Sequence, residues 1–326
     1  MSDFYKDKKT ISVVTSCFNE EENVEELFRS IEKVFQDNPR YMFEVIFMDN
    51  ASTDSTASVL RRIASSDKRV KVILNAKNFG HIRSPYHGLL QTKGDAVVMM
   101  ASDLQDPPEM IADFVKAWEN GADIVVGIKD KSKEGPLMFL VRRVFYYLSH
   151  KMSETDYIKN FTGFGLYDKK FVDVLRGLDE PYPYLRGLVA QFGSNIEKIR
   201  FTQPKRKAGR TKNNFYTLYD MAMLGFVNHS KIPIRLASFI GFTGAFMSFM
   251  VAIAYFAYKL IYWKSFEAGV APLVIGFFFV SSIQLLFIGI IGEYISSIYT
   301  QVKNQPLVIE KERINFEETD TKTLGQ

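Results

Sequence analysis

Two long runs without a charged residue constrain this chain more than any other feature. The first covers Leu236–Tyr258 and the second Ala271–Gly292, with Lys259, Lys264 and Glu267 between them. A helix rises about 1.5 Å per residue, so each run can cross a hydrocarbon core of about 30 Å. We therefore expect a transmembrane hairpin. Two buried helices of a soluble protein are the alternative, although such helices usually carry a polar stripe.

Basic residues flank the two runs and predict their orientation. Those before the first run are Lys205, Arg206, Lys207, Arg210, Lys212, Lys231 and Arg235, and those after the second are Lys303, Lys311 and Arg313. The turn between the runs carries only two lysines. The positive-inside rule then places both termini in the cytoplasm of a multi-pass protein of the bacterial inner or plasma membrane. Met1–Lys9 is polar, so we expect no cleaved signal peptide.

Charge and cysteine content exclude several functions. The net charge of +4 is the difference between 41 basic and 37 acidic residues, which is too balanced for a dedicated nucleic-acid binder. Cys17 is the single cysteine, so the chain has neither an internal disulfide nor a cysteine-rich metal site. We expect Cys17 to be a small packed residue. A length of 326 residues favours two or more units.

The first half of the chain alternates between strand-like and helix-like patterns. The predicted strands are Thr10–Thr15, Phe43–Met48, Val70–Leu74, Asp95–Met100 and Ile124–Gly127. Helical patterns follow Asn23 and Asp54 and recur at Tyr86–Thr92 and Pro108–Glu119. This alternation predicts an α/β fold with a Rossmann-like, mostly parallel sheet. A further loop and strand are expected over Thr155–Asp168.

Polar side chains follow four of the predicted strands. They are Asn19 with Glu20, Asp49, Asn78 and Asp103. In open α/β sheets, ligands bind outside the carboxyl ends of the strands. Four polar exits at one edge therefore predict a single site.

The fourth strand leads directly into the stretch with the most distinctive chemistry. Apolar residues run into Asp103, Gln105 and Asp106, and Pro107 and Pro108 then end the strand. Hard oxygen ligands of this kind suit Mg²⁺ or Mn²⁺, whose shell substrate phosphates usually complete. The alternative is a polar turn that caps the following helix.

Two amphipathic segments and a basic loop precede the apolar runs. The segments are Pro136–Met152 and Phe215–Lys231, and the loop is Pro204–Asn214. Amphipathic helices of this kind can cover a core, but basic flanks also suit an anionic membrane surface. Both interpretations remain open for the first segment.

Four motifs in order resemble a known family. They are Ser16–Asn23, Asp49–Thr56, Asn78–Gly80 and Asp103–Glu109. They resemble the GT-A glycosyltransferases of family two. With the C-terminal hairpin, the likeness is to polyprenyl-phosphate glycosyltransferases of the GtrB-type bactoprenol glucosyltransferase and dolichol-phosphate mannose synthase kind. The resemblance covers roughly Ile11 to Pro306.

The resemblance implies a domain plan and an activity. Residues 1–214 would form the GT-A domain, 215–234 a juxtamembrane helix, 235–295 two transmembrane helices (about 236–258 and 271–292) and 296–326 a cytoplasmic tail, polar and disordered after Asn315. The enzyme would move glucose from UDP-glucose onto undecaprenyl phosphate at the cytoplasmic leaflet. The displacement would be inverting and assisted by Mg²⁺ or Mn²⁺.

The resemblance also implies roles for individual residues. Phe18, Glu20 and Asp49 would hold the nucleobase and ribose, and Asp103 and Gln105 the metal ion. The family's basic loop is matched by Arg206, Gly209, Thr211 and Lys212, and its acceptor-side segment by Asp156. The catalytic residues would be Asp103, Asp156 and Arg206. Nucleotide-sugar binding would also involve Asn78, Ser102, Arg210 and Lys212. The turn Thr162–Phe164 matches the acceptor-side segment as well.

The chain departs from the family pattern at three positions. Ser16 stands where proline is common, and Ala101 stands at the first acid of the Asp-x-Asp pattern, so metal binding rests on Asp103, Gln105 and Asp106. Gly165 occupies the position of a family arginine, which shifts the phosphate clamp to Arg206, Arg210 or Lys212.

Several alternatives remain at this point. The donor could be GDP-mannose or another nucleotide-sugar, and a non-catalytic membrane nucleotide-sugar binder is a further possibility. A processive synthase would need more spans and a Gln-x-x-Arg-Trp motif, which is absent. Small residues spaced by four, Gly241 with Ala245 and Gly244 with Ser248, favour a homo-oligomer, or packing against the second run.

Overall fold

The computed structural model describes residues 8–130, 158–181, 183–204, 232–261, 270–303 and 305–317. The chain divides into two compact units. The sheet unit comprises Met1–Tyr146, Thr155–Phe215 and Asn304–Gln326, and the helical unit comprises Tyr147–Glu154 and Tyr216–Lys303. Both predicted amphipathic segments and most of the basic loop lie outside the described residues.

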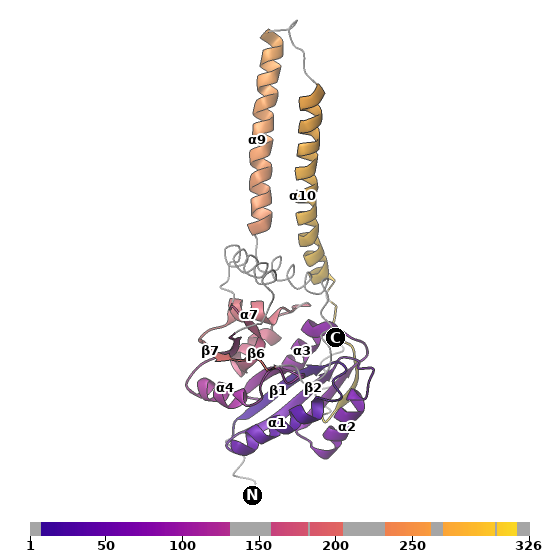
Figure 1. The fold of residues 1–326 in the computed structure, drawn as a ribbon, viewed down its shortest axis with the longest axis vertical. Helices are drawn as coiled ribbons and strands as arrows, with labels where there is room; N and C mark the ends of the chain where they lie inside the picture. The colour runs from indigo at the N-terminus through magenta and orange to yellow at the C-terminus, as the bar shows by residue number, and fades with distance from the viewer. Residues whose placement is uncertain are drawn as a thin grey trace. The chain divides into compact units, whose positions relative to one another are not determined.

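The sheet has eight strands in the order β7-β5-β6-β4-β1-β2-β3-β8 (Figure 1). The strands are β1 (Thr10–Cys17), β2 (Met42–Asp49), β3 (Val70–Asn75), β4 (Ala96–Ala101), β5 (Ile124–Lys129), β6 (Phe161–Asp168), β7 (Ile196–Phe201) and β8 (Glu310–Ile314). β1 to β4 run parallel to one another, and β5 runs parallel to β7, as the α/β prediction requires. β6 and β8 run antiparallel to their neighbours, so the sheet is mixed.

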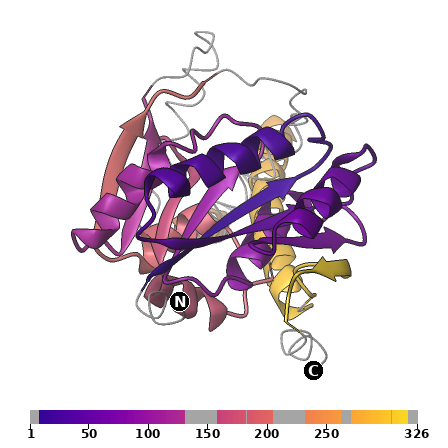
Figure 2. The ribbon, with the colours of Figure 1, turned by 90° about the horizontal axis from the view of Figure 1, so that it is seen from below.

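Helices cover both faces of the sheet (Figure 2). One face carries α1 (Val24–Asp37), α2 (Thr56–Ser66) and α4 (Met110–Glu119), and the other carries α3 (Gly80–Leu90), α6 (Lys169–Arg176) and α7 (Leu185–Phe192). Successive strand residues point to opposite faces, so Val13 packs in the first core and Val14 in the second. Burial on both faces explains why these strands are continuous apolar runs.

Helix α3 begins earlier than the sequence pattern predicts. The pattern indicates a helix over Tyr86–Thr92, whereas α3 covers Gly80–Leu90 and contains Pro85. Proline removes one intrahelical hydrogen bond, and Ser84 is polar yet fully buried, so the first turns carry no apolar signal. Ser84 faces the site described below.

Gly165 lies where β6 passes very close to β5. A Cβ atom built at this position lies 2.4 Å from the backbone oxygen of Val125. We expect Gly165→Ala to destabilise the sheet unit by about 3 kcal/mol, because backbone must move to relieve the clash. In a thermal-unfolding scan the midpoint should fall by roughly 6–12 °C.

Gly177 provides the matched control for this substitution. A Cβ atom there meets its nearest neighbour, the Val174 oxygen, at 3.5 Å, which is ordinary contact. Gly177→Ala should therefore leave the midpoint nearly unchanged. Equal midpoints for both variants would contradict the packing argument. The same crowding applies to any side chain at position 165, including the arginine of the family pattern.

The C-terminal strand β8 lies within the stretch expected to be a tail. Its sequence, Glu-Lys-Glu-Arg-Ile, is mostly charged, yet it pairs with β3 at the edge of the sheet. Glu310 accepts hydrogen bonds from His87 Nε2 at 2.6 Å and Arg313 Nη2 at 2.7 Å. Burial opposes ionisation of Glu310, but these bonds outweigh it and lower its pKa to about 2.

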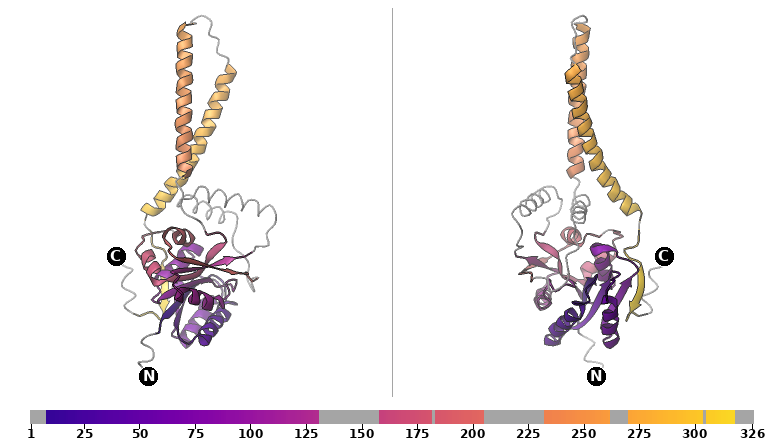
Figure 3. Two further views of the ribbon diagram at one scale, coloured as in Figure 1. Left: turned by 90° about the vertical axis from the view of Figure 1, so that its left-hand side faces the viewer. Right: turned by 45° about the vertical axis from the view of Figure 1, so that its right-hand side comes forward.

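The helical unit contains α9 (Ile232–Ile261) and α10 (Val270–Val302), which lie side by side (Figure 3). Large apolar side chains along both helices are exposed, including Phe242 at 77% and Phe277 at 69%. By length and composition, Phe279–Val302 is apolar enough to cross a membrane, and a shorter apolar stretch covers Ala237–Val251. Contiguous exposed apolar surface of this extent indicates membrane association.

Candidate functional site

Four strand exits meet at one edge of the sheet. The register pairs Cys17 with Asp49, Ser16 with Ala101, and Asp49 with Leu74. The loops that follow β1, β2, β3 and β4 therefore start side by side. The polar residues that the sequence places after these strands lie at this common edge.

Each exit contains one residue in the left-handed region of backbone space. The φ angles are 56° at Asn19, 61° at Ala51, 83° at Gly80 and 59° at Leu104. Alanine and leucine rarely adopt this conformation, which costs of order 1 kcal/mol or more. Such strain persists only where surrounding contacts enforce it, and it is concentrated at functional sites.

Hydrogen bonds join the exits of β1 and β2. The Asn19 side chain accepts from the Thr53 backbone at 2.8 Å, and its own backbone N–H donates to Ser52 Oγ at 2.9 Å. The Glu20 backbone donates to Thr56 Oγ1 at 2.9 Å. The buried Glu20 carboxylate accepts from Asn23 Nδ2 at 2.5 Å, so one of its oxygens is already engaged.

Asn50 joins the exits of β2 and β3. Its amide group donates to Asn78 Oδ1 at 2.9 Å and to the Gly80 carbonyl at 3.1 Å. Its oxygen accepts from the Phe79 backbone at 2.8 Å and from Asn75 Nδ2 at 3.2 Å. Asn50 is buried and satisfied on both sides, so it fixes the shape of the loop from Asn75 to Gly80.

Asp49 has a buried acceptor oxygen of the kind expected of a ligand-binding carboxylate. Its Oδ2 accepts from the Ser52 backbone at 3.2 Å, while Oδ1 is buried and has no hydrogen-bond partner among the described residues. Burial raises the pKa of Asp49, and the nearby charge of Asp54 raises it further. A hydroxyl or N–H of a ligand would satisfy the buried oxygen. Phe18 is partly exposed beside this position.

Two aspartates in the loop after β4 differ in burial: Asp106 is buried and Asp103 is partly exposed. Asp106 is buried, and its Oδ2 accepts from the Ala101 backbone at 2.8 Å, so it closes the turn. Burial raises the pKa of Asp106 to about 6, and the Asp103 charge adds to the effect. Asp103 is partly exposed and accepts from the Gln105 backbone at 3.2 Å, and Ser102 Oγ donates to the Ser16 carbonyl at 3.0 Å.

This arrangement fits a divalent ion with few protein ligands. Asp106 is committed to the backbone, whereas the side chains of Asp103 and Gln105 are partly exposed and carry oxygen atoms of the kind that bind such an ion. Among the described residues, no three His, Cys, Asp or Glu side chains form a metal cluster. Mg²⁺ characteristically retains waters and substrate phosphates with only one or two carboxylates, so this pair suits it.

The described part of the edge is acidic. Its carboxylates are Glu20, Asp49, Asp54, Asp103 and Asp106. The same edge also carries two cations, Lys77 in the loop after β3 and Arg83 in α3. The sequence-predicted residues Asp156, Arg206, Arg210 and Lys212 lie outside the described residues.

No role was predicted from the sequence for three residues that the structure brings together. Asn50, Asn75 and Ser84 form the buried network. Asn78 was predicted to bind nucleotide-sugar, and in the structure its Oδ1 accepts hydrogen bonds from Asn50 and from the Gly80 backbone. The position of Asn50 directly after Asp49 is a signal that could have identified it. Cys17 is buried as expected, and burial raises the pKa of its thiol.

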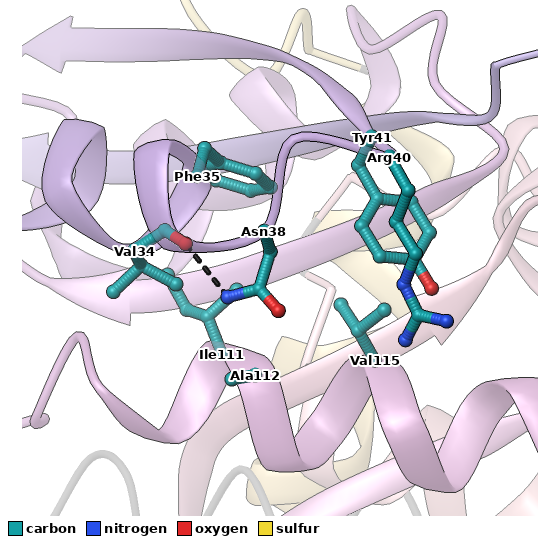
Figure 4. Close-up of a pocket in the computed structure, with 8 residues that line it drawn as sticks. All are labelled: Val34, Phe35, Asn38, Arg40, Tyr41, Ile111, Ala112 and Val115. Carbon is teal, nitrogen blue, oxygen red and sulfur yellow. Dashed lines mark hydrogen bonds between the residues drawn. The ribbon is translucent and has the colours of Figure 1, made fainter.

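A shallow pocket lies between α1 and α4, away from this edge (Figure 4). It is lined by Val34, Phe35, Asn38, Arg40, Tyr41, Ile111, Ala112 and Val115. Five of these residues lie where α1 ends and β2 begins, at the opposite end of β2 from its exit, and the other three lie in α4. The pocket therefore does not belong to the candidate site.

Comparison with known proteins gives consistent matches. The family model described as glycosyl transferase family 2 matches residues 12–172. The SfII prophage-derived bactoprenol glucosyl transferase of Shigella flexneri is 32% identical over 302 residues, covering 92% of this chain and 97% of that protein. The prophage bactoprenol glucosyl transferase homolog of Escherichia coli is 30% identical, covering 92% and 98%.

One solved structure is similar to part of this chain. Glucosyl-3-phosphoglycerate synthase from Mycobacterium tuberculosis, in complex with Mn²⁺, uridine diphosphate and glucosyl-3-phosphoglycerate, is 20% identical. It covers 67% of this chain and 78% of its own, with a TM-score of 0.48.

Proposed function

Because this chain belongs to glycosyl transferase family 2 and is a hexosyltransferase related to bactoprenol glucosyl transferases, we propose that it transfers glucose from UDP-glucose to undecaprenyl phosphate. The transfer takes place at the cytoplasmic face of a bacterial inner membrane. The observation that carries the proposal is the combination, in one chain, of the polar strand-exit edge with two helices exposing apolar side chains.

Chain topology supports two membrane crossings. Helices α9 and α10 follow β7 and precede β8, and both strands belong to one sheet. If α10 crosses the membrane, α9 must cross it too, because a single crossing would separate β8 from β3. The basic residues that flank the helices favour the cytoplasmic side for the sheet.

The chemistry requires an enzyme of this construction. A lipid phosphate stays at the membrane and a nucleotide-sugar stays in water, so a soluble site must be held against the bilayer. An oxygen of the lipid phosphate attacks the anomeric carbon of glucose. The bond from that carbon to the β-phosphate oxygen breaks, and UDP leaves. This single displacement inverts the anomeric configuration.

Different residues of the site bind the uridine, the metal ion and the phosphates. Asp49 and Phe18 bind the uridine, and Glu20 supports it. The second pKa of a phosphate monoester is about 6, so the acceptor needs little help from a base. Asp103 and Gln105 would hold Mg²⁺ or Mn²⁺, which when bound neutralises the charge on the departing diphosphate. Arg206, Arg210 and Lys212 supply further positive charge.

A donor screen tests the proposal. The purified protein is incubated with undecaprenyl phosphate, Mg²⁺ or Mn²⁺, and one radiolabelled donor: UDP-glucose, UDP-N-acetylglucosamine or GDP-mannose. We expect a labelled lipid only from UDP-glucose. A lipid labelled from GDP-mannose alone would replace glucose by mannose, and donor binding without any lipid product would indicate a non-catalytic binder.

We also propose a homo-oligomer formed through α9. A Cβ atom at Gly241 lies 3.9 Å from the Phe287 ring of α10, so α9 and α10 approach each other at this residue. A Cβ at Gly244 meets no atom within 4 Å. Small residues spaced by four let membrane helices approach closely, so the Gly244 side suits a second copy.

Light scattering of the detergent-solubilised protein, with the detergent mass subtracted, measures the assembly. Gly244→Leu/Ser248→Leu should dissociate a wild-type oligomer, because leucine keeps the backbones apart. Phe242→Leu/Phe246→Leu, which changes another exposed side of the helix, should leave it intact. A monomeric wild type would rule out the oligomer.

A further inference from the structure

The C-terminal strand contacts the loop that closes the donor side of the candidate site. β8 pairs with β3 up to Asn75, and the Ala76 backbone N–H then donates to the Ile309 carbonyl at 2.8 Å. The register shifts between Leu74 and Asn75, so the ladder contains a bulge at the last paired residue. Leu74 pairs with Glu312 and Asn75 with Glu310, so the extra residue is Lys311 of β8, and Asn75 is held by its pairing with Glu310.

The Asn75 side chain leads directly into the buried network of the site. Its amide donates to Asn50 Oδ1 at 3.2 Å and to Ser84 Oγ at 3.0 Å. Asn50 in turn holds Asn78 and Gly80, next to Asp49. The position of Asn75 therefore determines how the loop meets the donor.

Helix α3 is also attached to β8, through His87 and Glu310. Ser84 and His87 are three residues apart, so they lie on neighbouring parts of one helix face. Ser84 contacts Ser16 Oγ at 3.3 Å, and His87 contacts Glu310 at 2.6 Å. The first residue of α3 is Gly80, the last residue of the donor-side loop.

Glu310 is the buried centre of this attachment. Its side chain is 14% exposed, that of His87 6% and that of Arg313 9%. Arg313 also donates to Gln91 Oε1 at 2.9 Å, at the other end of α3. A single carboxylate thus joins β8 to α3, while the neighbouring Glu312 makes only an exposed ion pair with Arg61.

We propose that Glu310 is a positioning residue for nucleotide-sugar binding, acting through His87 and β8 on the loop from Asn75 to Gly80. The inference rests on the proposed function, because it assigns that loop to the donor side. It predicts that loss of the carboxylate weakens donor binding and leaves the lipid acceptor unaffected. A strand that only stabilised the fold would instead reduce the amount of active enzyme.

The test compares Glu310→Ala, Glu310→Gln and the matched control Glu312→Gln in the full-length protein. We expect the KM for UDP-glucose and the Kd for UDP, measured calorimetrically, to rise about tenfold in Glu310→Ala. Glu310→Gln retains an acceptor for His87, so both constants should rise only about threefold in this variant. Glu312→Gln should stay within twofold of wild type, because exposed ion pairs contribute little. The KM for undecaprenyl phosphate should change less than twofold in all three.

A double variant separates positioning from simple loss of stability. If Glu310 acts through His87, Glu310→Ala/His87→Gln should bind UDP no more weakly than Glu310→Ala alone. An unchanged UDP affinity in Glu310→Ala, or equal changes in both KM values, would overturn the inference. If the wild type binds UDP and transfers glucose, such a result counts against Glu310 alone. A wild type that binds none of the donors would instead overturn the proposed function.

Discussion

Asp103→Ala should lower kcat by about a thousandfold while the thermal-unfolding midpoint stays near that of wild type. The expected loss corresponds to about 4 kcal/mol of transition-state stabilisation, a magnitude typical of losing a catalytic metal ion. The side chain is partly exposed at the turn after β4, so its removal leaves no core cavity. Initial rates with saturating UDP-glucose and Mg²⁺ measure the effect.

Two comparisons make this result specific. Glu109→Ala removes an exposed carboxylate from the same loop, at the N-cap of α4, where it makes no capping hydrogen bond. Its rate should remain within twofold of wild type. Wild-type protein treated with EDTA should lose activity and regain it with Mg²⁺ or Mn²⁺. Full activity in EDTA would exclude the metal-assisted displacement.

The strands that carry the site were predictable because burial on both faces leaves an unmistakable pattern. Ala96–Ala101 is apolar throughout, and its polar residues begin where the strand ends. Parallel strands bring their exits together, so the sequence alone places Asp49 and Asp103 at one edge. Strand existence and the location of the site both follow from these local signals.

Strand β8 was not predictable in the same way. An edge strand needs little apolar surface, and charged side chains are common there because they discourage aggregation. Glu310–Ile314 therefore resembles a solvated tail until its pairing with β3 is known. Its partners His87 and Asn75 lie more than two hundred residues earlier in the chain, at a separation that no local pattern reports.

The buried network around Asn50 has a similar explanation. Each amide there is satisfied by a partner from another exit, so no single motif identifies the set. The early start of α3 was not predicted for a related reason. Ser84 faces this polar network at a position where a helix would usually bury an apolar residue, so the apolar periodicity is missing there. Local rules fail here because the site replaces apolar packing with hydrogen bonds.

Arg206→Ala/Lys212→Ala should lower kcat/KM for sugar transfer by roughly a hundredfold or more. The described edge carries Lys77 and Arg83 beside its carboxylates, and we expect the basic loop to add the positive charge that holds the diphosphate and the lipid phosphate. The basic loop, where both residues match the family pattern, is the strongest candidate in the sequence. Each charge-assisted contact contributes about 1.5–3 kcal/mol, or roughly ten- to a hundredfold. Single variants should fall between wild type and the double variant.

Lys207→Ala distinguishes phosphate contacts from general basicity. Lys207 lies in the same loop but outside the matched positions. A basic residue near an anionic bilayer contributes about 1 kcal/mol through surface attraction, which vanishes in neutral detergent. In neutral detergent, Lys207→Ala should therefore match wild type while the double variant stays impaired. If all the variants were equally active in detergent and equally impaired in vesicles containing anionic lipid, the loop would serve only to attract the membrane surface. The phosphate clamp would then have to lie elsewhere, with Arg210 the remaining candidate cation of the loop.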